Sequence, residues 1–349
     1  MFYRTAESVS PKHPDKLCDQ ISDAILDAYL SQDPNARVAA ETCGGHGVVF
    51  VTGEITSTAD NVDIEGIVKR ITGNPKIEVH TKIVKQSPEI AQGVDVGGAG
   101  DQGIMIGYAC DETSEMLPLE VVLSRRLNQY IYAQYPYDGK TQVTLNPEGK
   151  LASIVASFQN VSSEELSHLI SEWLRKESLV EEGRSTTYIS KEFLDDKEKL
   201  DILMQDKNSV FAYINPAGDW NQGGFEADTG LTGRKLIVDN YGPRIPIGGG
   251  CFSGKDATKV DRSAAYMARR VAVDYLRKRN AHEVFVRLAY AIGLAEPLEK
   301  TVIVDGKPEE IGGYDLTPAG IIKTLDLRRP IYEPTARYGH FGEGFDWDK

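Results

Sequence analysis

Residues 248–270 of this 349-residue chain read GGGCFSGKDATKVDRSAAYMARR, a glycine-rich loop that runs directly into a helical pattern. Few Cβ atoms stand in the way there, so successive backbone N–H groups can turn toward one anion. Residues 249–255 match the phosphate-loop pattern GxxxxGK[ST] until Asp256 replaces its hydroxyl residue. The lysines and aspartates of the stretch supply the charges wanted where polyphosphate and Mg²⁺ are held together. We interpret it as a phosphate cradle; the glycines alone would also fit a helix-capping loop.

The composition is that of a globular protein with a large core. Hydrophobic residues make up 41% and charged residues 26%. No apolar run approaches the roughly 18 residues of a membrane span. A formal charge of −13 argues against a general nucleic-acid binder, because non-specific binding needs a basic surface. The chain shows no apolar secretory segment at its start and no CxxC pair among its four cysteines. We therefore expect reduced thiols, a cytoplasmic location, and neither a membrane nor a nucleic-acid partner.

Residues 14–30 are expected to form an amphipathic helix, because their apolar side chains recur at intervals of three and four. Along another face Asp15, Asp19, Asp23 and Asp27 fall every four residues. Like charges at that spacing cost helix stability unless water or a cation compensates. Asp15, at the start of the helix, is a metal-ligand candidate. The other three are interpreted as a solvated face.

Residues 37–43 and 48–55 predict a β-hairpin around a glycine-rich turn. In a symmetric register Glu41 lies opposite Phe50, and the period of two then places Glu41, Phe50 and Glu54 on one face. The opposite face is apolar, as a core requires. The carboxylate face is either solvated or reserved for a cation or an ammonium group.

The loop at residues 86–103 is rich in glycine and contains the spacing GxGxxG. That spacing indicates a dinucleotide-binding turn only where it opens a helix, whereas here a strand at residues 104–109 follows. We reject the dinucleotide interpretation and expect a lid loop with Asp101 at its tight end. A short strand is expected at residues 236–239. Helices, strands and hairpins mix along the chain without a regular βαβ series, which favours an α+β fold.

Seven strings of the chain together resemble methionine adenosyltransferase, also called S-adenosylmethionine synthetase. They follow the family order and span almost the whole chain, and GAGDQG and GGGCFSGKDATKVDRSAAY are the most unusual of them. The strings are His13-Pro14-Asp15-Lys16, Gly53-Glu54-Ile55-Thr56, Lys85-Gln86-Ser87-Pro88 and residues 98–103, 230–235, 248–266 and 338–342.

The resemblance implies three similar units, each a sheet covered by helices, in a pseudo-threefold arrangement and interleaved along the chain. Linear boundaries approximate them as residues 1–86, 99–222 and 223–349, with a lid loop at residues 87–98. The resemblance also implies a homodimer or a dimer of dimers in which subunits share active sites.

The reaction implied by the resemblance is attack of methionine sulfur on C5′ of ATP, followed by hydrolysis of the released triphosphate to pyrophosphate and phosphate. A triphosphate leaving group develops charge, and a thioether has no proton to remove. Catalysis therefore needs positioned cations rather than a strong base. The implied cofactors are Mg²⁺, two ions per site, and K⁺. A phosphotransferase that leaves ADP, and a non-catalytic partner that keeps the fold, are the alternatives.

Site roles are assigned by similarity, position by position. The catalytic candidates are His13, Lys140, Arg234 and Lys255. Contacts to ATP or its phosphates are expected from His13, Asp101, Lys140, Trp220, Arg234, Lys235 and Lys255. Contacts to methionine are expected from Glu54, Gln86, Asp228 and Lys259. Metal ligands are expected to be Asp15 and Asp261 for Mg²⁺ and Glu41 for K⁺.

The chain departs from the family pattern at a few places. Asp219-Trp220 stands where relatives commonly have a basic residue and Phe. Trp can stack on adenine as Phe does, but Asp219 removes a positive charge. Ile247 replaces a frequent His, and the lid loop is short.

Overall fold

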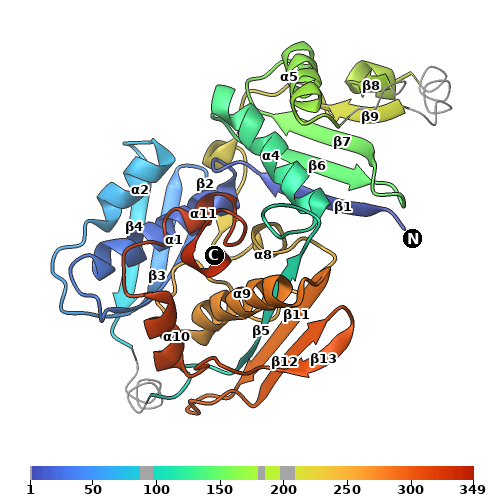
Figure 1. Ribbon diagram of the computed structural model, residues 1–349. Helices are drawn as coiled ribbons and strands as arrows, with labels where there is room; N and C mark the ends of the chain where they lie inside the picture. The colour runs from blue at the N-terminus through green and yellow to red at the C-terminus, as the bar shows by residue number, and fades with distance from the viewer. Residues whose placement is uncertain (1, 87–96, 180–184, 197–208) are drawn as a thin grey trace.

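The computed structural model describes residues 2–86, 97–179, 185–196 and 209–349. In these residues the strands form three sheets, each packed against helices (Figure 1). This confirms the expected α+β fold built from three sheet-and-helix units. The expected lid loop lies largely outside the described residues. None of the described helices is long and apolar enough to cross a membrane.

The first sheet has the strand order β10-β2-β3-β4. Helix α1 (Pro14–Leu30) packs on β2, and α2 (Ile64–Thr72) packs on α1. The apolar residues of α1 and the inner faces of β2 and β3 are buried in one core, as their spacing predicts. The strands are β2 (Arg37–Gly45), β3 (Val48–Thr56), β4 (Glu78–Val84) and β10 (Gly230–Leu231).

The second sheet has the order β1-β6-β7-β9-β8 and carries a core of its own. Helix α4 (Leu119–Gln134) lies against β1 and β6, and α5 (Ser163–Lys176) packs on α4 and β9. A capping box between Ser162 and Glu165 begins α5. The strands are β1 (Arg4–Val9), β6 (Gly139–Leu145), β7 (Leu151–Phe158), β8 (Ser185–Ile189) and β9 (Ser209–Ile214).

The third sheet has the order β13-β12-β11-β5, and the long helix α9 (Val260–Arg279) covers β5 and β11. Each sheet takes a strand from a distant part of the sequence. In Figure 1 β1 lies beside β6 and β5 beside β11. The third such pair is β10 with β2. The remaining elements are β5 (Gly103–Cys110), β11 (Glu283–Tyr290), β12 (Glu299–Val304), β13 (Lys307–Glu310), α6 (Lys191–Leu194), α8 (Leu236–Asp239), α10 (Pro318–Leu325), α11 (Thr335–Tyr338), η1 (Gly224–Glu226) and η2 (Asp346–Asp348).

Two local expectations were wrong. Residues 236–239 form the helical turn α8 rather than a strand, because a short apolar run has no period that separates the two. In the β2–β3 hairpin Glu41 lies opposite Thr52, not Phe50, because the turn contains only His46 and Gly47. Both turn residues have positive φ, as a tight two-residue hairpin requires. The register differs by two residues, so the shared face of Glu41, Phe50 and Glu54 is unchanged.

The aspartates of α1 are not a solvated face. Asp19 and Asp23 are buried, and Asp23 forms a bidentate ion pair with Arg262 of α9, with oxygen to nitrogen distances of 2.6 and 2.9 Å. Gly254 N, in the glycine-rich loop, donates to the same carboxylate at 2.8 Å. The compensating charge comes from 239 residues away in sequence, so helical spacing alone could not reveal it.

We expect Arg262→Met to destabilise the protein by about 3–5 kcal/mol, because it leaves Asp23 buried without its counter-ion. The shift of the urea unfolding midpoint measures this. Arg279→Met is the matched control, since Arg279 of the same helix pairs with Glu309 at the surface. Water screens such a surface pair, so its loss should leave the midpoint nearly unchanged. Equal midpoints for the two variants would show that the buried pair does not stabilise the fold.

Candidate active site

The N-terminus of α1 gathers a first set of candidate residues. Lys235 Nζ donates to Asp15 Oδ2 at 2.6 Å, and Arg234 Nε lies 3.3 Å from Asp15 Oδ1. Burial alone would raise the pKa of Asp15, but the hydrogen bonds from Lys235 and Leu231 N outweigh it and lower the pKa. We call this set the α1 group; with the residues whose charges act on His13, it contains His13, Asp15, Lys140, Asp228, Arg234 and Lys235.

His13 caps α1 and is only 6% exposed. Burial, together with the charges of Lys235 and Lys140, lowers the pKa of His13 to about 3. The imidazole is therefore neutral at neutral pH and carries one proton. Because Nδ1 accepts a hydrogen bond from Asp15 N at 3.2 Å, that proton is on Nε2. His13 thus offers a neutral N–H donor rather than a cation.

Ser157 of β7 relates Lys140 and Trp220 to each other in the second sheet. Lys140 on β6 lies opposite Ser157 on β7, and Trp220 Nε1 donates to Ser157 Oγ at 3.1 Å. Trp220 is half-buried, so part of its ring remains available. The neighbouring Asp219 accepts from Ser163 Oγ at 2.6 Å, which commits its carboxylate to the start of α5.

Asp138 is a further candidate site residue that the sequence interpretation missed. It is buried two residues before Lys140 and accepts a hydrogen bond from Gly224 N at 2.9 Å. Burial raises the pKa of Asp138 despite that hydrogen bond and the nearby charge of Lys140. Its closeness to Lys140 in the sequence was the only available signal, and many strand-end aspartates share it.

The glycine-rich loop carries a second set of residues around Lys255. Lys255 Nζ pairs with Asp261 Oδ2 at 2.7 Å, and the charge of Asp101 also acts on Lys255. Burial would lower the pKa of Lys255, but the Asp261 carboxylate outweighs it and the pKa is raised. Gly254 has φ of +80°, and a Cβ there would lie 1.9 Å from Ala40 O, so only glycine fits.

The loop extends the first sheet and thereby brings Lys255 to its exposed face. Lys255 forms an isolated bridge with Ala39, and Ala39 lies opposite Glu54. Ala39, Glu41 and Glu54 share one face because their positions alternate along paired strands. We call Asp101, Lys255, Asp261, Glu41 and Glu54 the loop group. Within the described residues no hydrogen bond or ion pair joins the loop group to the α1 group.

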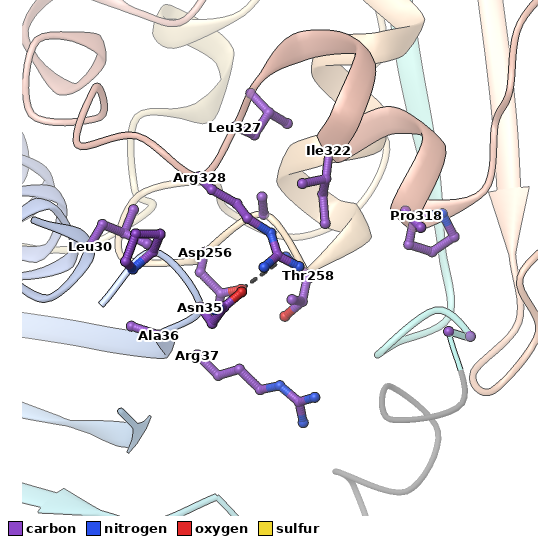
Figure 2. A pocket seen from close by; sticks show the side chains of 15 residues that line it. Leu30, Asn35, Ala36, Arg37, Asp256, Thr258, Pro318, Ile322, Leu327 and Arg328 are labelled. Atoms are coloured by element: carbon purple, nitrogen blue, oxygen red, sulfur yellow. Dashed lines mark hydrogen bonds between the residues drawn. The ribbon is translucent and has the colours of Figure 1, made fainter. Parts of the chain in front are cut away.

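Two expected methionine contacts, Gln86 and Lys259, form no hydrogen bond or ion pair with either group among the described residues. Gln86 is half-buried, and its Oε1 has no hydrogen-bond partner among the described residues. Lys259 Nζ pairs with Asp256 Oδ2 at 2.5 Å, and Val38 N donates to the same oxygen. A cavity of about 260 Å³ lies beside this pair, between Arg37, Thr258 and Arg328 (Figure 2). Lys259 is therefore held by Asp256 at the N-terminus of α9. No contact among the described residues joins it to Glu54.

The carboxylates proposed for Mg²⁺ are each held by a lysine. Among the described residues no three His, Cys, Asp or Glu side chains form a metal-binding cluster. Asp15 is paired with Lys235, and Asp261 with Lys255. Mg²⁺ commonly binds one or two carboxylates plus substrate phosphates and water. The donor set therefore fits ions that arrive with a polyphosphate.

Comparisons with known proteins point to one family over the whole chain. Models of the S-adenosylmethionine synthetase N-terminal, central and C-terminal domains match residues 1–88, 96–220 and 222–349. An S-adenosylmethionine synthase of Thermus thermophilus is 44% identical over 390 residues, covering 99% of this chain and 95% of that protein. Those of Bifidobacterium adolescentis and Clostridium tetani are 42% and 43% identical, covering 99% and 97% of this chain and 95% and 93% of the relatives.

We expect His13 to remain neutral in the free protein as the pH falls from 6.5 toward about 3. A histidine NMR titration should show an Nε2–H imidazole there, whereas the exposed His282, whose pKa is raised by Asp111, should titrate above its ordinary value. In the unfolded chain His13 takes up a proton near pH 6.5, whereas in the folded chain it does not until about pH 3. The contribution of His13 therefore lowers the stability of the fold as the pH is lowered from 6.5 to about 3. His13→Asn should lessen that fall; a His13 signal that titrates with His282 would contradict the assignment.

Proposed function

The chain belongs to the S-adenosylmethionine synthetase family and makes S-adenosylmethionine from ATP and L-methionine, and we propose the route and the residues that carry it. The observation that supports the route best is the pairing of Asp15 with both Arg234 and Lys235. Asp15 and Lys235 are 220 residues apart in the sequence. Asp15 hydrogen-bonds to the neutral donor His13 through its backbone N–H, and its carboxylate holds Arg234 and Lys235, the second of which also acts on His13 by its charge. A donor flanked by cations suits a leaving group that is a polyphosphate.

In the proposed route the methionine sulfur uses a lone pair to form a bond to C5′ of ATP. The C5′–O5′ bond breaks, and its electron pair leaves with the triphosphate. No proton is removed from sulfur, so no general base is required. His13 Nε2–H donates to O5′ as charge develops there. The triphosphate charge is stabilised by Lys140, Arg234, Lys235 and Lys255. Water then attacks a phosphorus of the triphosphate and yields pyrophosphate and phosphate.

The proposed substrate contacts follow from the chemistry of each group. Trp220 provides a flat surface for adenine, with Asp101 at the nucleotide end of the site. The methionine ammonium needs acceptors, and Glu54 together with Gln86 Oε1, which has no hydrogen-bond partner among the described residues, supplies them. Asp228, whose charge reaches His13, completes this set. Lys259 would bind the methionine carboxylate only after leaving Asp256.

Two Mg²⁺ ions per site would be held by Asp15 and Asp261, and they supply charge neutralisation to the phosphates when bound. Lys235 and Lys255, which pair with these carboxylates in the free protein, would then turn to the phosphates. Glu41 would hold K⁺. Glu41 is a single exposed carboxylate, so the other oxygen ligands of K⁺ must come from residues outside this face of the first sheet.

We further propose that a working site combines the α1 group of one subunit with the loop group of another, in a homodimer or a dimer of dimers. The exposed face of the first sheet supports this proposal, because it combines the loop-group carboxylates with the large side chain of Phe50, 50% exposed. Val84 and Leu231, of the same sheet, are also exposed. A facing subunit would cover these apolar groups. Four free cysteines agree with a cytoplasmic location, which is also part of the proposal.

Product analysis by mass spectrometry after incubation with ATP, methionine, Mg²⁺ and K⁺ tests the reaction. We expect S-adenosylmethionine, pyrophosphate and phosphate; ADP would instead indicate a phosphotransferase. Lys255→Ala should lower kcat by about 10²–10³-fold, as expected when one preorganised charge is removed. Lys278→Ala, an exposed lysine of α9, is the control and should leave kcat unchanged.

Mixing inactive variants tests the shared site. His13→Ala and Lys255→Ala should each be inactive, but mixed dimers would contain one site with both residues intact. Random pairing predicts recovery of about a quarter of wild-type activity. Glu54→Gln mixed with Lys255→Ala is the matched control and should recover none, because both residues lie on one face of one chain. If the first mixture stays inactive while mixed dimers are shown to form, each site lies within one subunit.

A further inference from the structure

The four aspartates of α1 form a row that anchors three loops. Successive members are four residues apart, which is about 6 Å along the helix axis. Each accepts a hydrogen bond from a backbone N–H of a segment far away in sequence. The anchors are Leu231 N on Asp15 at 3.0 Å, Gly233 N on Asp19 at 2.8 Å, Gly254 N on Asp23 at 2.8 Å, and Tyr332 N and Glu333 N on Asp27 at 3.0 and 2.8 Å.

Two of these anchors immediately precede the cations assigned to the triphosphate. Gly233 is followed by Arg234 and Lys235, and Gly254 is followed by Lys255. The anchor on Asp27 differs, because residues 332–333 and their neighbours include no candidate site residue. Of the four members, Asp15 pairs directly with Arg234 and Lys235, Asp19 and Asp23 each anchor the residue before a candidate catalytic cation, and Asp27 anchors neither.

Asp19 is held firmly enough to act as an anchor. It is buried, and its second oxygen accepts from Lys16 Nζ at 3.2 Å. Lys16 is itself buried and pairs with Asp239 at 2.6 Å. The anchored segment has little room to shift, since a Cβ on Gly233 would lie 2.4 Å from Cys251 Cβ. The carboxylate, the loop and the glycine-rich segment thus pack as one unit.

We propose that Asp19 and Asp23 are positioning residues for S-adenosylmethionine synthesis: they fix the backbone from which Arg234, Lys235 and Lys255 reach the triphosphate, without contacting substrate themselves. Lys and Arg side chains are long and flexible, so the place of the backbone sets where their charges can stand. A misplacement of about 1 Å can lower a rate about 10²-fold. The inference rests on the proposed function, because it assigns those cations to the triphosphate.

A purely structural role for the row makes a different prediction. Every member would then affect stability, and none would affect turnover of the folded enzyme. Asp27 provides the comparison, since it caps backbone N–H groups from the same helix face but no site loop. Asp23 is a poor test residue because its loss also breaks the Arg262 pair. The experiment therefore uses Asp19.

Steady-state kinetics should be measured for wild type, Asp19→Ala, Asp19→Asn, Asp19→Glu and Asp27→Ala, at a temperature where circular dichroism shows each folded. We expect kcat of Asp19→Ala to fall about 10²-fold while the KM for methionine stays unchanged. Asp19→Asn retains an oxygen that can accept from Gly233 N and should recover most of the loss. Asp27→Ala should unfold at a lower temperature yet keep its kcat.

Asp19→Glu keeps the charge and the acceptor but moves them by one methylene, so it tests the position even if Asp19→Ala does not fold. A lowered kcat in folded Asp19→Glu supports positioning. Equal kcat values for the Asp19 variants and Asp27→Ala would overturn the inference while leaving the reaction intact. A wild-type enzyme that forms no S-adenosylmethionine would remove the proposed function and, with it, this inference.

Discussion

The buried ion pair between Asp23 and Arg262 is the constraint on which the rest of the structure depends. Both guanidinium Nη atoms reach the carboxylate, Gly254 N adds a third donor, and the guanidinium also lies 4.2 Å from the ring centroid of Tyr332. Replacing such a pair by apolar residues is often neutral for stability, and we infer that its contribution to the fold lies in specificity. Each group can be satisfied in only one arrangement of α1, α9, the glycine-rich loop and the C-terminal segment. The site loops are consequently placed before any ligand binds.

Local signals predicted the elements well where the stabilising contacts were also local. The helix expected from Pro14 to about Leu30 was confirmed, because Pro14 and the apolar spacing act within the segment itself. For the hairpin, the predicted register was wrong but the predicted face of each side chain was right. Alternation along the strand determines the face, whereas the length of the turn determines the register. Residues 236–239 are only four residues long, which is too short for a hydrophobic period to distinguish a helix from a strand. Their helical turn is instead set by the loop of Lys235, whose carbonyl accepts from Asp239 N.

The candidate site shows the same difference between local and long-range contacts. Strings of adjacent residues identified His13 with Asp15, and Lys255 with Asp261, and the structure brings both pairs together. Which strings meet one another could not be deduced, because ion pairs across hundreds of residues leave no spacing to find. The interpretation of Asp19 and Asp23 as solvated failed for this reason: like-charge repulsion along a helix is cancelled by donors that only the folded chain supplies.

Helix α1 connects the α1 group and the loop group of one subunit, which in the proposed dimer belong to different active sites. Asp19 anchors the segment of Arg234 and Lys235, which belongs to the α1 group, and Asp23, one turn later, anchors the segment of Lys255, which belongs to the loop group. Backbone hydrogen bonds keep successive turns of a helix at a fixed rise, so the two anchors cannot move apart. In the proposed dimer, one helix therefore sets the distance between a half of one site and a half of the other. Any shift of the glycine-rich loop that follows phosphate binding must either strain the Asp23 anchor or displace α1. Because a coupling free energy acts equally in both directions, the Arg234 and Lys235 segment would act on the loop to the same extent.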